Sequence, residues 1–112
     1  MKSIVVYHSK YGSTREYAEW IGAETGAEVV ELKQAKQKDL AAYDAVAFGC
    51  PFYAGRLKMA GFVQECAPNL AGKRVAFFAV TARGPEDAGI AADYEKALPE
   101  DVRRNIRFFA QS

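Results

Sequence analysis

Hydrophobic and polar stretches alternate along the chain in a strand-then-helix pattern. The stretch 3–7 is a continuous run of β-branched and aromatic residues, as is typical of a strand buried on both faces of a parallel sheet, and four further stretches are predicted as strands. The expected strands are 3–7, 28–32, 44–49, 74–80 and 105–110. Each connection is long enough for a right-handed crossover, so the pattern predicts one doubly wound α/β domain over residues 1–112.

Three of the four connections carry apolar residues at helical spacing. Helices are expected over about 14–24, 59–66 and 90–98, and a short helix or a loop is expected over 34–42. The expected strand order is 2-1-3-4-5, which places a ligand at the carboxyl ends of the first and third strands.

The composition narrows the class of protein. Half of the 112 residues are hydrophobic and the formal net charge is +1, which argues against a disordered chain and against a nucleic-acid-binding surface. No apolar stretch approaches the roughly 20 residues that span a bilayer, and the first residues resemble a strand rather than a signal peptide. Cys50, Cys66 and the single histidine, His8, form neither a disulfide framework nor a metal cage. We therefore expect a cytoplasmic protein with reduced thiols, no nucleic-acid partner and no transmembrane segment.

The segment between the first strand and the first helix carries the clearest candidate chemistry. It contains Ser9, Lys10, Tyr11, Gly12, Ser13 and Thr14. A helix N-terminus offers unpaired N–H groups and a partial positive charge, which suit a phosphate group. Gly12 lets the backbone close around the anion, and the three hydroxyl side chains can donate further hydrogen bonds. The alternative is an ordinary turn in which Ser13 or Thr14 is the helix N-cap.

Two further loops are expected at the same edge of the sheet. The first runs from Cys50 to Arg56 and includes Pro51, Phe52, Tyr53, Ala54 and Gly55, and the second includes Thr81, Ala82, Arg83 and Gly84. Tyr53, with small neighbours, is expected to stack on a flat ring system, whereas Phe52 is expected to pack into the core. Backbone groups of the second loop can border such a ring, while the alternative for Arg83 is a solvated surface charge.

Together these three loops resemble those of the flavodoxin family, and the resemblance covers nearly the whole chain. It implies a flavodoxin-like fold that binds FMN, with the phosphate held by residues 9–14 and the flavin between the loops at 50–56 and 81–85. The motifs at 10–16 and 49–57 are similar to the branch that includes menaquinone-dependent protoporphyrinogen oxidase. The resemblance therefore implies an FMN-dependent oxidoreductase or electron carrier, with a redox partner or quinone-type acceptor.

The chain departs from simple flavodoxins in three respects. Tyr11 stands where they carry a threonine, which points to the oxidase-like branch. Simple flavodoxins are strongly acidic, whereas this chain is close to neutral, which does not favour docking on basic partners. The family continues past the fifth strand into a final helix, whereas the given sequence stops at Ser112. Two alternatives stay open: one face at the sheet edge is uncovered, which favours self-association as a homo-oligomer, or the sequence is a shortened form of a chain that continues.

Two arginines, Arg56 and Arg83, lie in or beside the expected flavin loops. A guanidinium near N1 of the flavin would stabilise the reduced anion by roughly 4 kcal/mol, at about 4 Å and an effective dielectric near 20, before solvation losses. That contribution would raise the redox potential and favour two-electron chemistry. The alternative is that both side chains point into water.

A cysteine-dependent phosphatase is an alternative from a different class. Cys50 and Arg56 have the C-x5-R spacing of such enzymes, in which a thiolate attacks phosphorus and the arginine holds the oxygens. Pro51 counts against this function because it removes an N–H that the phosphate cradle needs. Leu57 also replaces the hydroxyl residue that usually follows the arginine.

Two further alternatives share the fold class. A receiver domain needs acidic residues after the first strand and an aspartate at the end of the third, and the chain has none at these places. A flavodoxin-like module that has lost FMN and serves as a binding or structural protein stays open. His8 is expected to pack or hydrogen-bond at the strand end, and Cys66 is expected in the core.

Overall fold

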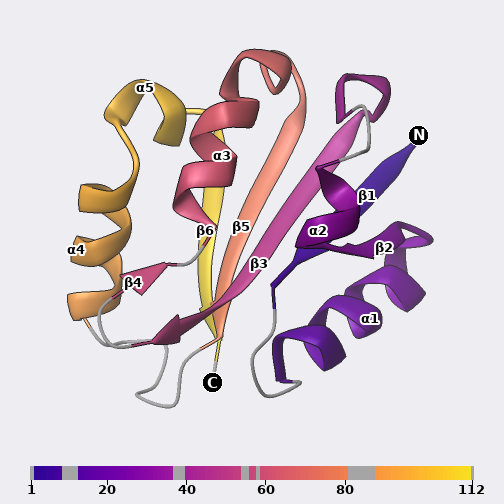
Figure 1. The fold of residues 1–112 in the computed structure, drawn as a ribbon, viewed down its shortest axis with the longest axis horizontal. Helices are drawn as coiled ribbons and strands as arrows, with labels where there is room; N and C mark the ends of the chain where they lie inside the picture. The colour runs from indigo at the N-terminus through magenta and orange to yellow at the C-terminus, as the bar shows by residue number, and fades with distance from the viewer. Residues whose placement is uncertain are drawn as a thin grey trace.

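The structure, a computed structural model, describes residues 2–8, 13–36, 40–53, 56–57, 59–80 and 88–111. Its strands are β1 (Ser3–Tyr7), β2 (Glu28–Glu31), β3 (Ala45–Tyr53), β4 (Arg56–Leu57), β5 (Arg74–Val80) and β6 (Ile106–Gln111). Five of these described strands pair in parallel in the order β2-β1-β3-β5-β6, while β4 pairs antiparallel with the end of β3 (Figure 1). Counted over the parallel strands, the predicted order 2-1-3-4-5 is confirmed.

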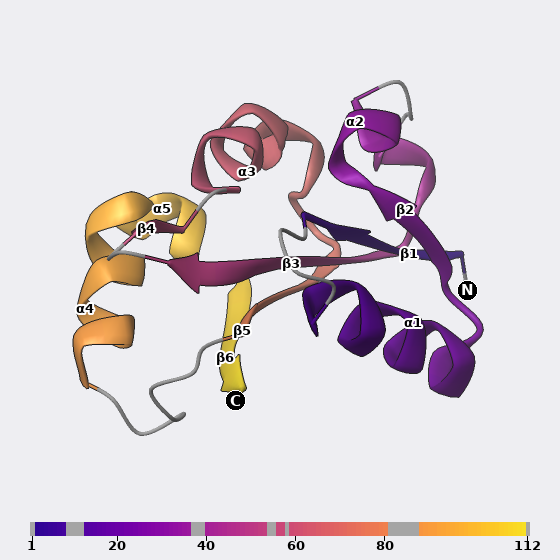
Figure 2. The same cartoon turned by 60° about the horizontal axis from the view of Figure 1, so that its bottom comes forward.

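The connections between the strands are helical, as the apolar spacing predicts. The helices are α1 (Ser13–Thr25), α2 (Leu32–Ala35), α3 (Ala60–Cys66), α4 (Ala88–Ala97) and α5 (Glu100–Arg103), with single 3₁₀ turns η1 (Leu40–Ala42) and η2 (Ala67–Asn69). In Figure 2, α1 lies on one side of the sheet, and α2 and α3 lie on the other. No helix within the described ranges is both long and apolar enough to cross a membrane.

The helix α5 was not predicted. Pro99 marks the end of the predicted fourth helix, but its backbone also precedes a new one, with φ −61° and ψ 155°. A proline fixes φ near −65° and is tolerated at the start of a helix far better than in its interior. Pro99 therefore separates α4 from α5 and also precedes the first turn of α5. The result is a four-residue helix, too short to show a periodic apolar pattern.

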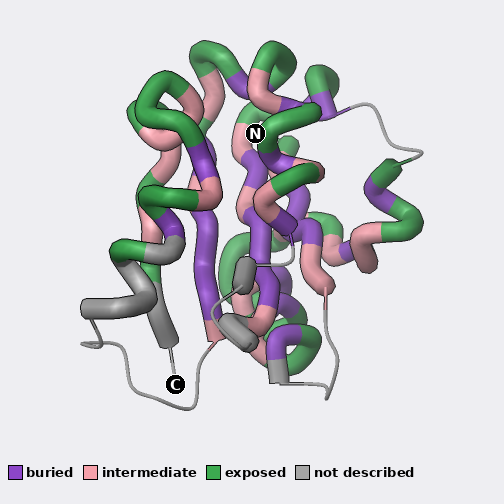
Figure 3. The backbone as a smooth tube through the Cα atoms, turned by 60° about the vertical axis from the view of Figure 1, so that its left-hand side comes forward, coloured by how far each residue is buried: buried purple, intermediate pink, exposed green. Residues whose placement is uncertain are grey.

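The core is divided between the two faces of the sheet. The larger cluster lies on the side of α2 to α5 and includes the fully buried Phe48, Phe77 and Met59. The smaller cluster lies under α1 and contains Val5, Ala18 and Phe78. Figure 3 shows buried positions concentrated along the strands, with exposed positions on the outer turns of the helices. The central strands β1, β3 and β5 are apolar at most positions, as expected for strands covered on both faces.

Strand β3 is longer than predicted. The expected loop at 50–56 is wrong for residues 50–53, which first pair with the end of β5 and then form a short hairpin with β4. Pro51 is tolerated in this strand because its missing N–H would point to the β1 side, where β3 has no partner beyond Gly49. Gly49, two residues earlier, accepts the His8 N–H at 2.9 Å on the β1 side, and pairing with β1 ends at Gly49. The missing N–H of Pro51 therefore faces no partner strand.

Gly49 also lies beneath an aromatic ring. The side chain of Phe78 crosses from β5 over the backbone of Gly49 and packs against Tyr17 of α1, with ring centroids 5.1 Å apart. A Cβ atom at position 49 would overlap three carbons of this ring. The absence of a side chain at Gly49 therefore makes room for Phe78, which is only 2% exposed.

Candidate functional site

The segments predicted to bind a ligand leave neighbouring strands at one edge of the sheet. Tyr7, the last residue of β1, is paired with Gly49 of β3, and the next residue, His8, donates its N–H to the Gly49 carbonyl. On the other side of β3, Pro51 is paired with Val80, the last residue of β5. The end of β1, the middle of β3 at Gly49 to Pro51 and the end of β5 therefore lie side by side at the carboxyl edge of the parallel strands, where a doubly wound sheet is expected to bind a ligand.

Helix α1 begins at this same edge. It follows β1 in the chain and crosses back along the sheet, so its N-terminus at Ser13 lies at the carboxyl ends of the strands (Figure 1). Thr14, in the first turn, is only 1% exposed. Apart from tyrosine hydroxyls and cysteine thiols, no other polar side chain in the described part of the chain is buried. A thirteen-residue helix with its N–H groups and positive dipole end at this edge provides an attractive field for an anion.

The predicted site residues fall into three groups. Thr14 and Pro51 are described with their side chains, and Pro51 is half-buried. Ser13, Phe52 and Tyr53 are described by their backbone only, at the start of α1 and the end of β3. The remaining predictions lie outside the described residues: Ser9, Lys10, Tyr11, Gly12, Ala54, Gly55, Thr81, Ala82, Arg83 and Gly84. The predicted stacking of Tyr53 and packing of Phe52 stay predictions.

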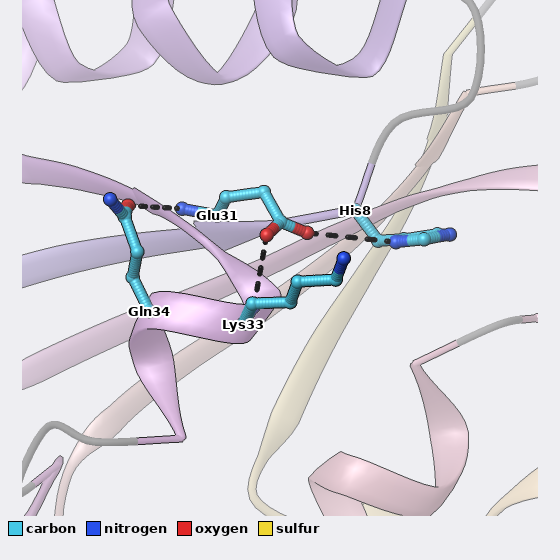
Figure 4. A network of polar contacts seen from close by, with 4 residues as sticks. All are labelled: His8, Glu31, Lys33 and Gln34. Carbon is cyan, nitrogen blue, oxygen red and sulfur yellow. Dashed lines mark hydrogen bonds and ion pairs between the residues drawn. The ribbon is translucent and has the colours of Figure 1, made fainter.

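A polar network at the edge was not predicted from the sequence (Figure 4). His8 Nδ1 lies 3.8 Å from Glu31 Oε1, at the ends of the neighbouring strands β1 and β2. Glu31 also caps α2, because its Oε2 accepts the Lys33 N–H at 3.0 Å and its own N–H donates to Gln34 Oε1 at 3.3 Å. The network ties β1, β2 and α2 together beside the start of the 9–12 segment.

One part of this network does have a sequence signal. A polar residue followed three positions later by glutamine is the pattern of a capping box, and Glu31 and Gln34 fit it. The contact of Glu31 with His8 depends instead on the β1–β2 register, which pairs Tyr7 with Glu31. His8 thus forms a strand-end hydrogen bond through its backbone, as expected, and has an acidic neighbour that local patterns do not reveal.

Both cysteines lie in environments that suit core packing. Cys50 is fully buried within β3, in the larger core cluster, rather than in an open loop. Burial raises the pKa of Cys66 to about 11, so its thiol is neutral near pH 7 and a poor nucleophile. These surroundings do not support the phosphatase alternative. Within the described ranges, no group of three or more histidine, cysteine or acidic side chains could hold a metal ion.

A groove of about 840 Å³ lies at the opposite end of the sheet from these loops. It is lined by residues near the amino ends of the strands, including Ser3, Ala45, Arg74 and Asn105, together with Ile21 of α1. It therefore does not belong to the candidate site at the carboxyl edge.

The sequence and the fold both match known proteins. A family model described as flavodoxin domain matches residues 4–111. The chain belongs to the flavodoxin domain family. No curated protein is similar enough in sequence to count as a relative. The predicted membership of the flavodoxin family is thereby confirmed, and so is the expectation of a flavodoxin-like fold.

Several solved structures share this flavodoxin fold. Oxidised flavodoxin 2 from Bacillus cereus is 21% identical with a TM-score of 0.72, and the match covers 99% of this chain and 84% of that one. A flavoprotein from Lactobacillus acidophilus NCFM in complex with FMN is 17% identical with a TM-score of 0.70, over 98% and 91% of the two chains. A flavodoxin from the domain Archaea is 25% identical with a TM-score of 0.66, over 100% and 85%.

Proposed function

We propose that this flavodoxin-domain chain binds FMN at the carboxyl edge of its sheet and transfers electrons through it. The observation that carries the proposal is the hydrogen bond of 2.9 Å from the His8 N–H to the Gly49 carbonyl. It joins the end of β1 to Gly49 of β3, so the predicted phosphate-binding segment and the predicted flavin-flanking segment, which starts at Cys50, begin next to each other. A single nucleotide can therefore contact both segments, with its phosphate at the N-terminus of α1.

The chain's own residues supply different parts of this site. The N–H groups of the first turn of α1, together with the hydroxyls of Ser13 and Thr14, would hold the phosphate. The segment around Tyr53 would border the flavin from the end of β3, and the segment at 81–84 from the end of β5. When bound, FMN supplies the redox chemistry, and the protein sets its position and electrostatic surroundings. The Lactobacillus acidophilus flavoprotein, which shares the fold, is in complex with FMN, and this supports the proposal.

For the electron acceptor we propose a quinone-type molecule or another small redox partner. A net charge of +1 does not provide the strong single-sign field that steers a carrier onto an oppositely charged protein. The motifs at 10–16 and 49–57, which resemble the protoporphyrinogen oxidase branch, support an oxidoreductase of this kind. A cytoplasmic location is in keeping with this chemistry and with the reduced thiols.

Replacing Thr14 with valine tests the placement of the phosphate. The change keeps the shape of the side chain and removes one hydroxyl, so we expect the Kd for FMN to rise roughly 10- to 100-fold. That range corresponds to one hydrogen bond of about 1.5–3 kcal/mol to a charged group. The Kd is measured by titrating flavin fluorescence, and the urea midpoint of each variant reports whether the fold is intact.

Thr25→Val is the matched control on the same helix. Thr25 lies at the other end of α1, where its hydroxyl donates to the Ile21 carbonyl at 2.7 Å. We expect the Kd of this variant to equal that of the parent. Equal FMN affinity in the parent, Thr14→Val and Thr25→Val proteins would contradict the proposed role of Thr14.

A further inference from the structure

His8 connects neighbouring strands at the carboxyl edge of the sheet. Its backbone N–H donates to the Gly49 carbonyl of β3 at 2.9 Å, and its Nδ1 atom lies 3.8 Å from Glu31 Oε1 at the end of β2 (Figure 4). Four residues separate it from Ser13, the first residue of α1. The imidazole therefore lies at the edge where the phosphate of FMN is proposed to bind, and the inference below rests on that proposed function.

The carboxylate that faces His8 is held in place by the start of α2. Glu31 Oε2 accepts the Lys33 N–H at 3.0 Å, and the Glu31 N–H donates to Gln34 Oε1 at 3.3 Å, which together form a capping box. Because Oε2 is used by the cap, Oε1 is left directed towards His8 (Figure 4). The carboxylate therefore stays beside the imidazole whether or not that ring is charged.

The distance between these two side chains fits an interaction of charges better than a neutral hydrogen bond. Hydrogen bonds from nitrogen to oxygen are about 2.7–3.2 Å long, whereas 3.8 Å lies within the range of an ion pair. Histidine is the side chain that ordinarily gains or loses its charge between about pH 5 and pH 8. The side chains of His8 and Glu31 are 36% and 32% exposed, so protons from water can reach them.

The other charges near this pair come from α2 and α1 in the described part of the chain. Lys33 of α2 extends its side chain towards His8 (Figure 4). In the first turn of α1, Arg15 already forms an ion pair within the helix and Glu16 is exposed, while β3 has no charged residue. The group of His8, Glu31 and Lys33 therefore has no net charge when the imidazole is neutral, and a single positive charge when it is protonated.

We propose that protonation of His8 strengthens the binding of FMN, so that the affinity decreases as the pH rises and the imidazole loses its proton. The added positive charge stabilises the phosphate anion at the N-terminus of α1 and offsets the repulsion between that anion and the Glu31 carboxylate. Water and salt screen charges at a partly exposed edge, so the effect amounts to a few-fold change in affinity.

The Kd for FMN of the parent protein and of His8→Gln, measured at about pH 5.5 and about pH 8, tests this proposal. The phosphate of FMN has its own ionisation near pH 6, but it affects both proteins equally and is removed by taking the ratio of their Kd values. We expect His8→Gln to bind FMN about three- to tenfold more weakly than the parent at the lower pH, and about equally at the higher pH.

Lys33→Gln is the matched control at the same strand end. It removes a charge that is permanent over this pH range, so its Kd relative to the parent is expected to be the same at both pH values. Riboflavin is the control ligand, since it has no phosphate and its relative binding to the parent and to His8→Gln should not depend on pH. The urea midpoint of each variant at both pH values reports whether the fold is intact.

The single histidine of the sequence allows a second measurement on the unaltered protein. Because linkage is reciprocal, a proton that strengthens FMN binding is itself bound more tightly when FMN is present. We therefore expect the C2 proton resonance of His8, followed by NMR, to titrate at a higher pH in the FMN complex than in the flavin-free protein.

Two outcomes would overturn the proposal. The first is a Kd ratio between His8→Gln and the parent that is the same at both pH values, as a merely structural role of the side chain would give. The second is a His8 resonance that titrates at the same pH with and without FMN. A parent protein that binds no FMN at either pH contradicts the proposed function itself, and the role of His8 falls with it.

Discussion

Replacing Gly49 with alanine is expected to destabilise the protein by about 3 kcal/mol. The added methyl group would overlap three ring carbons of Phe78, which lies directly over Gly49 and is 2% exposed. Overpacking of this kind typically costs about 1–3 kcal/mol, and displacing a buried ring adds the loss of its packing. The free energy of unfolding, measured by urea denaturation and circular dichroism, checks this value.

A second variant and a control make the test specific. If the overlap with Phe78 is the cause, Gly49→Ala adds little further destabilisation to Phe78→Ala, because the ring that it would strike is gone. Gly61→Ala is the matched control, since a Cβ at Gly61 of α3 meets nothing within 4 Å. There alanine is expected to stabilise the helix by up to about 1 kcal/mol. Equal effects of alanine at Gly49 and Gly61 would contradict the account of this contact.

Replacing Phe77 with alanine is expected to destabilise the protein by about 3–5 kcal/mol. Phe77 is fully buried in the larger core cluster, where its ring lies 5.6 Å from that of Tyr94 and 6.1 Å from that of Phe108. These contacts join β5, β6 and α4, so a cavity at this place loosens the α4 side of the sheet as well as removing buried surface. Urea denaturation followed by tyrosine and tryptophan emission measures the loss.

Phe109→Ala is the comparison for this variant. Phe109 lies on β6 but is 43% exposed, so its truncation removes far less buried surface. At protein concentrations below the onset of self-association we expect a loss of less than about 1 kcal/mol. A loss of stability as large as that of Phe77→Ala would contradict the expectation that the cost of truncating these side chains follows their burial.

The strands and their order could be predicted because they depend on local composition and on general rules of connection. Runs such as 74–80 are apolar at nearly every position, which distinguishes a strand buried on both faces from an amphipathic helix. The right-handed crossover rule then leaves few arrangements for five parallel strands. The same reasoning placed the end of the first strand beside Gly49, and the His8–Gly49 hydrogen bond confirms this neighbourhood, although β3 itself continues to Tyr53.

The features that could not be predicted depend on neighbours distant in sequence. In the sequence alone, Pro51 indicates a loop. It is tolerated in β3 because pairing with β1 ends at Gly49, so no strand needs the N–H that proline lacks. Gly49 has no local signal for its role, since the ring above it comes from Phe78, twenty-nine residues later in the sequence. The contact between His8 and Glu31 likewise requires the β1–β2 register. At the site itself, the contacts of Tyr53 and Gly12 with a ligand stay predictions.

Titration of the protein with FMN and, in parallel, with riboflavin tests the central claim most directly. Riboflavin has the same ring system but no phosphate, so a site built on the N-terminus of α1 must discriminate between them. We expect a yellow complex with FMN and a thermal midpoint that rises with FMN concentration, together with at least tenfold weaker binding of riboflavin. A protein that stays colourless and unshifted with FMN, or that binds both flavins equally, would contradict the account.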